Sequence, residues 1–136
     1  YLLGGISGHA GLFSTASDIA NFSKLFINDG IILGRRYLKK NIINKFTKRE
    51  NYPVGTDRTI GWDTPSQNGK SSAGDYFSNK TFGHLGFTGT SLWIDPEQDL
   101  VVVLLTNRVY PSRENTKEMY GFRRDFHNSL VKIIGD

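Results

Sequence analysis

The sequence has no cysteine, one methionine and four prolines among its 136 residues. Without cysteine, the chain cannot form disulfides or thiolate zinc sites, and it cannot use a thiol as a nucleophile. This absence is compatible with any cellular compartment. The chain also lacks any apolar run near the roughly 20 residues that a helix needs to cross a bilayer. We therefore exclude thiol chemistry and expect no membrane span.

Several cofactor and catalytic patterns are missing as well. The glycines form no phosphate-binding or dinucleotide-binding pattern, and His9, His84 and His127 lack metal-ligand spacing. Residues 4–11 come close to a nucleophile elbow, but His9 stands where that pattern requires glycine. Ser7 is therefore a poor candidate nucleophile, and a tight loop at a helix N-terminus is the simpler interpretation. His9 is expected to be structural, with lining of a cleft as the alternative, and no metal or cofactor is expected.

Positive charge is concentrated in one stretch of the chain. The net charge is +4, and basic residues cluster between residues 35 and 49. A nucleic-acid or other anion-binding patch has this appearance. A solvated helix face is the better interpretation, because Leu38, Ile42 and Phe46 recur within the stretch at helical spacing. We expect no nucleic-acid partner.

The chain begins at Tyr1, without an initiator methionine or a signal-peptide pattern, which indicates a processed chain or an excerpt from a longer one. A helix is predicted soon afterwards. Residues 15–18, Thr-Ala-Ser-Asp, have the form of a capping box with Asp in place of Glu. The apolar stripe that follows consists of Ile19, Phe22, Leu25 and Phe26. Asp29-Gly30 then has the composition of a helix C-terminus.

Strands are predicted in the middle of the chain. Residues 59–63 favour a short strand, and residues 64–80, rich in Ser, Gly and Asn, indicate a long surface loop. Residues 90–94 and 100–105, joined by a turn, predict a hairpin. The second of these runs is apolar throughout, which suits a central strand buried on both faces.

A final helix completes the predicted order of helix, helix, strands, helix. Its apolar face is expected to contain Met119, Phe122, Phe126, Leu130 and Ile133. The order predicts an α+β fold in which helices flank an antiparallel sheet. We expect a single partial domain over residues 1–136, with a helical part at 1–50, sheet strands within 59–107, and a C-terminal helix at 115–134 that packs on the sheet.

The most informative segment surrounds His84. Gly83, Gly86 and Gly89 flank this histidine, and glycines are needed where a backbone and a ligand approach closely. Histidine titrates near neutral pH and can hold a substrate carboxylate or hydroxyl. A partly buried histidine that bonds a backbone carbonyl is the alternative. Spacing alone leaves both interpretations open.

Two long segments resemble serine hydrolases related to class C β-lactamases. They are residues 8–22, GHAGLFSTASDIANF, and residues 82–96, FGHLGFTGTSLWIDP, and the similarity continues through residues 104–111. The family includes penicillin-binding proteins, D-stereospecific peptidases, esterases and β-lactamases. The resemblance implies a partial serine β-lactamase-like fold and a periplasmic or extracellular location.

The resemblance also implies an acyl-enzyme mechanism and roles for particular residues. A serine in Ser-x-x-Lys attacks an ester or amide, a tyrosine in Tyr-x-Asn assists proton transfer, and a third motif is Lys/His-Thr/Ser-Gly. His84, Leu85 and Gly86 match that third motif. The backbone N–H of Phe87 is then expected to be one oxyanion donor. Leu85 and Asn107 are expected to contact the substrate.

The sequence departs from the family pattern in two ways. Leu85 replaces a hydroxyl residue that helps to hold the substrate carboxylate, which argues against classical penicillin recognition. Tyr-x-Asn is absent, and Ser-x-x-Lys occurs only as Ser129 to Lys132 near the end of the last helix, where coincidence is the better interpretation. We therefore expect the C-terminal half of a hydrolase for ester, amide or D-amino-acid peptide substrates, inactive alone.

Two partners and one alternative function follow from this interpretation. The partners are a small-molecule, peptide or glycan substrate and the missing N-terminal half of the domain. An exposed sheet edge also favours association between copies of the chain. The alternative is a non-catalytic binding or accessory module of a larger glycan-processing protein. Residues 109–113 support that context because they resemble domains attached to family-three glycoside hydrolases.

Overall fold

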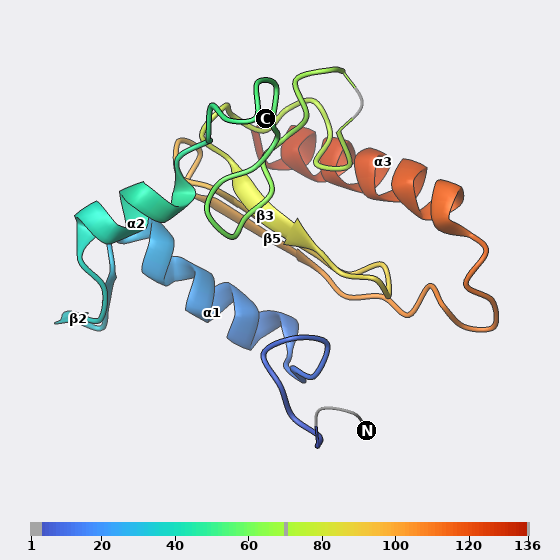
Figure 1. The fold of residues 1–136 in the computed structure, drawn as a ribbon, viewed down its shortest axis with the longest axis horizontal. Helices are drawn as coiled ribbons and strands as arrows, with labels where there is room; N and C mark the ends of the chain where they lie inside the picture. The colour runs from blue at the N-terminus through green and yellow to red at the C-terminus, as the bar shows by residue number, and fades with distance from the viewer. Residues whose placement is uncertain (1–3, 70, 136) are drawn as a thin grey trace.

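The structure is a computed structural model that describes residues 4–69 and 71–135. Its elements are α1 (Ala16–Ile27), β1 (Ile31–Ile32), β2 (Arg35–Arg36), α2 (Lys40–Thr47), β3 (Phe82–Leu85), β4 (Ser91–Asp95), β5 (Leu100–Leu104) and α3 (Thr116–Gly135). Strands β3, β4 and β5 form an antiparallel sheet, and α1 and α3 lie on its opposite faces (Figure 1). The predicted α+β arrangement of helices flanking an antiparallel sheet is confirmed. No helix among the described residues has both the length and the apolar character needed to span a membrane.

Helix α1 begins and ends as the sequence predicts. The Thr15 hydroxyl accepts a hydrogen bond from the backbone N–H of Asp18 at 3.1 Å and donates one to the Asp18 carboxylate at 3.0 Å. At the other end, Asp29 adopts a φ of 52° and the N–H of Gly30 donates to the carbonyl of Leu25 at 2.7 Å. This six-to-one bond satisfies a carbonyl that the helix itself leaves unpaired.

The register of the sheet assigns each side chain to a face. His84 pairs with Leu92, and Leu92 pairs with Val103. Because alternate residues of a strand point to opposite faces, Phe82 shares the face of His84. Phe82 meets Phe26 of α1 edge to face, with ring centroids 5.8 Å apart. His84 therefore lies on the α1 face of the sheet, whereas α3 covers the other face.

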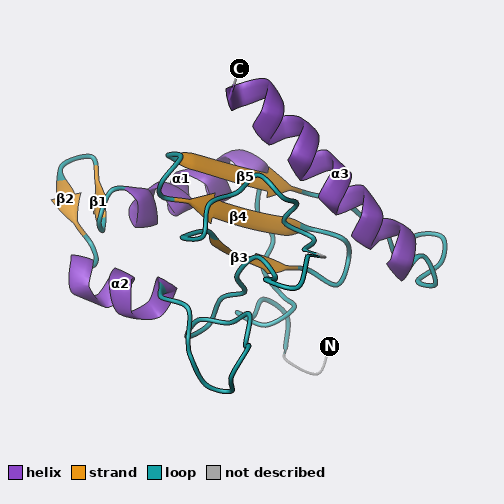
Figure 2. Ribbon diagram, turned by 90° about the horizontal axis from the view of Figure 1, so that it is seen from above, coloured by secondary structure: helices purple, strands orange, loops and turns teal. Residues whose placement is uncertain are grey.

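The core is centred on β4, which lies between β3 and β5 (Figure 2). Trp93 and Ile94 on this strand are 2% and 0% exposed. The prediction that residues 100–105 form a central strand was wrong, because β5 is an edge strand of this sheet. Only Val102 of β5 is buried, and the other residues of the strand are half-buried. Among the described residues, the continuous apolar run is thus only partly covered.

The buried face of α3 differs from the predicted apolar stripe. Its buried residues are Arg123, His127 and Val131, spaced four apart along one side of the helix. Phe122 and Ile133, which were expected to face the core, are 50% and 77% exposed. Apolar periodicity does not predict this face, because two of the three buried side chains are polar.

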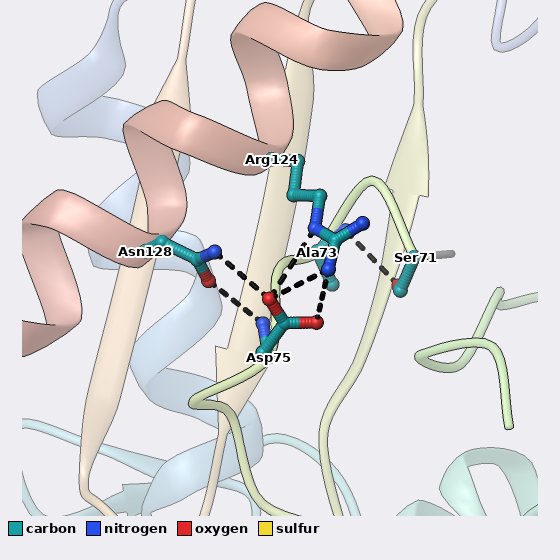
Figure 3. A network of polar contacts seen from close by, with 5 residues as sticks. All are labelled: Ser71, Ala73, Asp75, Arg124 and Asn128. Carbon is teal, nitrogen blue, oxygen red and sulfur yellow. Dashed lines mark hydrogen bonds and ion pairs between the residues drawn. The ribbon is translucent and has the colours of Figure 1, made fainter. Parts of the chain in front are cut away.

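The segment 64–80 was predicted as a surface loop, and part of it is buried. Residues 71–74 are buried beneath α3. The loop is fastened there by Asp75, whose carboxylate pairs with the guanidinium of Arg124 at 2.9 Å and accepts from the Asn128 side-chain amide at 3.0 Å (Figure 3). The backbone N–H of Asp75 donates to the Asn128 side-chain oxygen at 2.7 Å.

Smaller differences concern short elements. In α2 the buried residue is Ile43, whereas Ile42 and Phe46 of the predicted stripe are 40% and 43% exposed. Residues 59–63 contribute only isolated bridges, in which Asp63 pairs with Arg58 and with a residue of β3. The β1–β2 hairpin was not predicted, because strands of two residues carry no detectable alternation.

Candidate active site

A cleft of about 750 Å³ lies between α1 and the β3–β4–β5 sheet. The lining residues from α1 and the segment before it are Leu12, Phe13, Ser14, Asp18, Ile19 and Phe22. Those from the sheet and its turns are His84, Leu85, Gly86, Thr90, Ser91, Leu92, Val103 and Leu105. Asp18 and His84 are the ionisable side chains among these residues, and Asp18 is engaged in the cap of α1. His84 is therefore the ionisable group that is available for chemistry in an otherwise mainly apolar cleft.

The tautomer of the neutral His84 ring is determined by a contact within its own strand. Its Nδ1 atom lies 2.9 Å from the backbone oxygen of Leu85. A carbonyl oxygen only accepts hydrogen bonds, so this contact requires a proton on Nδ1. In the neutral ring, Nε2 then carries the free lone pair. The side chain is exposed, so Nε2 is accessible as an acceptor of a proton or hydrogen bond.

The turn after His84 presents a backbone N–H that has no acceptor among the described residues. The N–H of Gly86 donates to the carbonyl of Thr90 at 2.8 Å, and that of Gly89 donates to the carbonyl of Gly86 at 3.1 Å. Within residues 4–69 and 71–135, no atom accepts a hydrogen bond from the N–H of Phe87. A backbone donor without an internal acceptor, beside an ionisable side chain, is one component of an oxyanion site.

Two arginines hold the carbonyl oxygens of this turn. Arg123 of α3 donates from Nε to Gly89 at 3.0 Å, and from Nη2 to Gly86 at 2.8 Å and Thr90 at 2.7 Å. Arg108 donates from Nε to the carbonyl of Phe87 at 2.7 Å. Burial lowers the pKa of Arg123 below its usual value, and the charge of Arg108 acts in the same direction. Neither arginine was predicted as a site residue: Arg108 lies within the matched residues 104–111 without an expected role, and Arg123 lies outside the matched segments.

Phe87 and Asn107, two other predicted site residues, are not among the residues that line the cleft. The Phe87 side chain is 61% exposed and does not line the cleft; its ring lies 4.9 Å and 5.3 Å from the guanidinium carbons of Arg108 and Arg113. Phe87 directly follows Gly86, which does line the cleft. Asn107 is exposed after β5 and is not among the lining residues. The roles expected for His84, Leu85, Gly86, Phe87 and Asn107 stay predictions.

The other two histidines lie apart from this cleft. His9 is exposed, and its backbone N–H donates to the Ser7 hydroxyl at 3.2 Å. His127 is fully buried on the α3 side of the sheet, with Nδ1 2.8 Å from the carbonyl oxygen of Ser72 and Nε2 3.3 Å from the hydroxyl of Ser91. The described part of the chain contains no group of His, Asp and Glu side chains that could hold a metal.

Comparison with known proteins identifies close sequence relatives. A provisionally named D-alanyl-D-alanine carboxypeptidase of Salmonella gallinarum is 36% identical over 121 residues, which is 86% of this chain and 27% of that protein. A protein of Salmonella typhi with the same provisional name is 35% identical over the same shares. The chain thus spans about a quarter of the length of these relatives, 27% in each case.

A family model and a solved structure agree with this relationship. A crystal structure of a β-lactamase from Mycobacterium bovis superposes with a TM-score of 0.69 at 18% identity, covering 88% of this chain and 44% of that one. At 18% identity, this similarity shows that the two chains share a fold and nothing more. The family model described as Beta-lactamase matches residues 1–122. Because that match includes nearly all of the 136 residues, the chain belongs to the β-lactamase family.

Proposed function

We propose that this chain supplies one wall of the active site of a serine hydrolase that forms an acyl-enzyme with ester, amide or D-amino-acid peptide substrates. The main support is that His84 and Gly86 line the cleft under α1, and that the N–H of Phe87, the residue after Gly86, has no backbone acceptor among the described residues. The third motif of the family combines an ionisable side chain with an oxyanion donor in this order. In the proposed role, Nε2 of His84 takes part in proton transfer or holds the substrate, and the Phe87 N–H binds the oxyanion.

The proposal includes a nucleophile from outside this chain. The hydroxyls of the two serines that line the cleft each have a hydrogen-bond partner. The Ser14 hydroxyl lies 3.4 Å from the carbonyl of Thr15, and the Ser91 hydroxyl lies 3.3 Å from Nε2 of His127. A nucleophilic serine needs a general base within hydrogen-bond reach. His127 is buried on the opposite face of the sheet from the cleft, and therefore does not serve a substrate in it. We infer that residues 1–136 alone are inactive.

The surface around the cleft supports association with a further part of the same protein. Leu12 and Phe13 are 77% and 91% exposed, and Phe22 of α1 is 53% exposed. Beside them, β5 is an edge strand, and edge strands present unpaired backbone groups to a further strand. We propose that the remainder of the catalytic domain covers these apolar side chains and contributes the nucleophile. Association between two copies of the chain is the alternative use of this surface.

The named relatives support a role in the cell wall. Their provisional names indicate removal of D-alanine from D-alanyl-D-alanine. We propose that this chain belongs to a periplasmic or extracellular protein with substrates of that chemical kind. The apolar side chain of Leu85 favours a substrate whose carboxylate is absent or is held elsewhere, such as an ester.

A non-catalytic binding module is the second candidate. It is favoured by one observation, that no serine among the described lining residues has a general base on the cleft side of the sheet, because the only base beside Ser91 is His127 on the α3 side. In this reading the cleft binds a peptide or glycan, and the motif residues serve recognition only. The two candidates differ in whether the complete protein reacts covalently with an active-serine probe.

The deciding experiment uses the complete product of the gene that encodes this chain. We expect a fluorophosphonate to label one serine outside residues 1–136, and the labelled protein to lose hydrolysis of p-nitrophenyl acetate. His84→Gln should lower the rate of hydrolysis, whereas His9→Gln, at an exposed position away from the cleft, should not. Residues 1–136 expressed alone should be neither labelled nor active. Saturable peptide or glycan binding by an unlabelled, inactive complete protein would instead establish the binding module.

A further inference from the structure

Arg123 is a buried arginine whose partners are all backbone oxygens. The residue is 6% exposed, and its guanidinium reaches the carbonyls of Gly86, Gly89 and Thr90 at 2.7–3.0 Å. No carboxylate in the described ranges forms an ion pair with it. Burying a charge without an opposite charge is unfavourable, so an arginine in this position requires a compensating function or an unusually complete set of hydrogen bonds.

The bond from Arg123 to Gly86 also determines where the N–H of Phe87 points. The carbonyl of Gly86 and the N–H of Phe87 belong to the same peptide group. That group is planar and trans, so its C=O and N–H point in opposite directions. Arg123 belongs to α3, which lies on the opposite face of the sheet from α1 (Figure 1), whereas the cleft is lined by α1. Holding the carbonyl on the α3 side therefore turns the N–H of Phe87 away from α3.

Arg108 fixes the following peptide group in the same way. Its Nε donates to the carbonyl of Phe87 at 2.7 Å, and its backbone N–H donates to the carbonyl of Thr88 at 2.9 Å. The peptide groups before and after the Phe87 α-carbon are thus each anchored by a guanidinium. Rotation of the Gly86–Phe87 peptide would break a charge-assisted, partly buried hydrogen bond, which is costly.

We propose that Arg123 is a positioning residue that orients the Phe87 N–H as an oxyanion donor and polarises it through the Gly86 carbonyl. This inference rests on the proposed function, because it assigns a support to the donor named there. The positive charge of the Arg123 guanidinium lies on the carbonyl side of the Gly86–Phe87 peptide group, opposite the proposed oxyanion. This charge favours an anion bound at the N–H of Phe87. Pre-organised donors of this kind contribute to catalysis because they need no reorientation when the oxyanion forms.

The chemistry of the guanidinium explains why this residue is arginine. Its planar fork presents several N–H groups in fixed directions, and here it bridges three carbonyls of one short turn. A lysine ammonium is a point charge on a flexible stem and cannot hold three separated acceptors in the same geometry. A lysine at position 123 should keep the positive charge but hold the Gly86–Phe87 peptide group less firmly in its orientation.

A purely structural anchor of α3 would use the same contacts, so the test must separate the two roles. If Arg123 only anchors α3, replacing it lowers the amount of folded protein but leaves kcat of the folded molecules unchanged. A positioning residue lowers kcat and kcat/KM by the same factor in the protein that is folded, because the oxyanion forms only in the transition state. The neighbouring Arg124 provides the matched control, since it fastens the helix to Asp75 at the surface (Figure 3), and its guanidinium hydrogen bonds go to Asp75 rather than to the turn.

The experiment compares Arg123→Gln, Arg123→Lys and Arg124→Gln in the complete gene product, with rates expressed per fluorophosphonate-labelled site. Loss of an oxyanion donor lowers kcat by about 100- to 1000-fold. For misorientation of the donor in Arg123→Gln we expect a smaller loss, about 10- to 100-fold, with KM changed less than about twofold. Arg123→Lys should be intermediate, and Arg124→Gln should match the unsubstituted protein. A boronic-acid transition-state analogue should lose affinity by the same factor as kcat/KM.

Each other outcome has a defined meaning. Unchanged kcat per labelled site in Arg123→Gln, or an unrotated Gly86–Phe87 peptide in its crystal structure, would overturn the inference and leave the proposed function standing. If Arg123→Gln does not fold, Arg123→Lys decides in the same way. A complete protein that gives neither label nor hydrolysis would overturn the proposed function, and this inference with it.

Discussion

His127 on α3 and Ser91 on β4 meet across the helix–sheet interface, with 3.3 Å between Nε2 and the hydroxyl oxygen. Both residues are buried, at 0% and 4% exposure. The Nδ1 atom lies 2.8 Å from the carbonyl of Ser72, which only accepts, so the proton resides on Nδ1 and Nε2 accepts from Ser91. The neutral imidazole is thus fully bonded, and it fastens the buried loop and the central strand to α3.

This arrangement predicts a loss of stability in acid. Burial lowers the pKa of His127 from its usual 6.5, as does the charge of Arg123, against the opposing effect of the Ser72 hydrogen bond. Below this pH the unfolded chain binds a proton that folded His127 does not. The contribution of His127 to the free energy of unfolding is therefore complete above about pH 6.5. It declines as the pH falls, by at most about 1.4 kcal/mol per pH unit.

Thermal unfolding of the complete gene product at about pH 8 and about pH 5 measures this effect. We expect the unsubstituted protein to lose more stability in acid than His127→Gln, whose amide can replace both hydrogen bonds but does not titrate. His9→Gln, at an exposed position, should leave the difference unchanged. Equal acid sensitivity in the His127 variant and the unsubstituted protein would show that His127 is not the group responsible.

Gly83 should not tolerate a side chain. A Cβ added there would overlap the backbone oxygen of Leu92 and come within 2.5 Å of the Trp93 ring. Gly83→Ala therefore forces β3 away from β4, and we expect a destabilisation of about 1–3 kcal/mol, as for overpacking in a core. Gly121 on α3 is the control, because no described atom lies within 4 Å of its added Cβ. Gly121→Ala should stabilise by about 0.5–1 kcal/mol, and equal effects at both sites would contradict the packing of the sheet.

Leu85 should control which substrates react. Leu85→Thr restores the hydroxyl of the third motif, and a hydrogen bond to a charged group contributes about 1.5–3 kcal/mol. We expect acylation of the complete protein by a fluorescent penicillin to become about tenfold faster or more. Leu85→Val has the shape of threonine without the hydroxyl and should give no such gain. Equal rates in the two variants would mean that residue 85 does not contact the substrate carboxylate.

The apolar surface beside the cleft should make the isolated chain associate. Exposed side chains at Leu12, Phe13 and Phe22 line the same cleft as Val103 of β5, whose outer edge pairs with no described strand. Light scattering of residues 1–136 should therefore detect oligomers, and Phe13→Ser should reduce them. A stable monomer that unfolds cooperatively would indicate that this surface needs no cover.

Local rules accounted for the elements whose signals lie close together in the sequence. The cap at Thr15, the termination at Asp29 and the hairpin between β4 and β5 each depend on a few neighbouring residues. The faces that those elements bury were harder to predict. Arg123 and His127 face inward because they bond the turn 86–90 and the carbonyl of Ser72, and those partners are distant in sequence.

The candidate site shows the same division. The glycine-rich segment pointed to His84, and the family resemblance pointed to Phe87, while the sheet register places His84 beside the α1 cleft. The guanidinium groups behind the turn come from residues far along the chain, at positions 108 and 123. Tertiary packing brings them together behind the turn, so the resemblance at residues 104–111 includes Arg108 without indicating its role, and no local pattern singles out Arg123.

The most direct test of the proposed site is a crystal structure of the complete gene product carrying a covalent phosphonate on its active serine. The phosphonate oxygen stands in for the oxyanion of the tetrahedral intermediate. We expect that oxygen to lie about 2.7–3.1 Å from the backbone nitrogen of Phe87, the range of an oxyanion donor. His84 should line the same cavity. An oxyanion held by donors elsewhere in the protein, with Phe87 far from the adduct, would contradict the assignment of this wall.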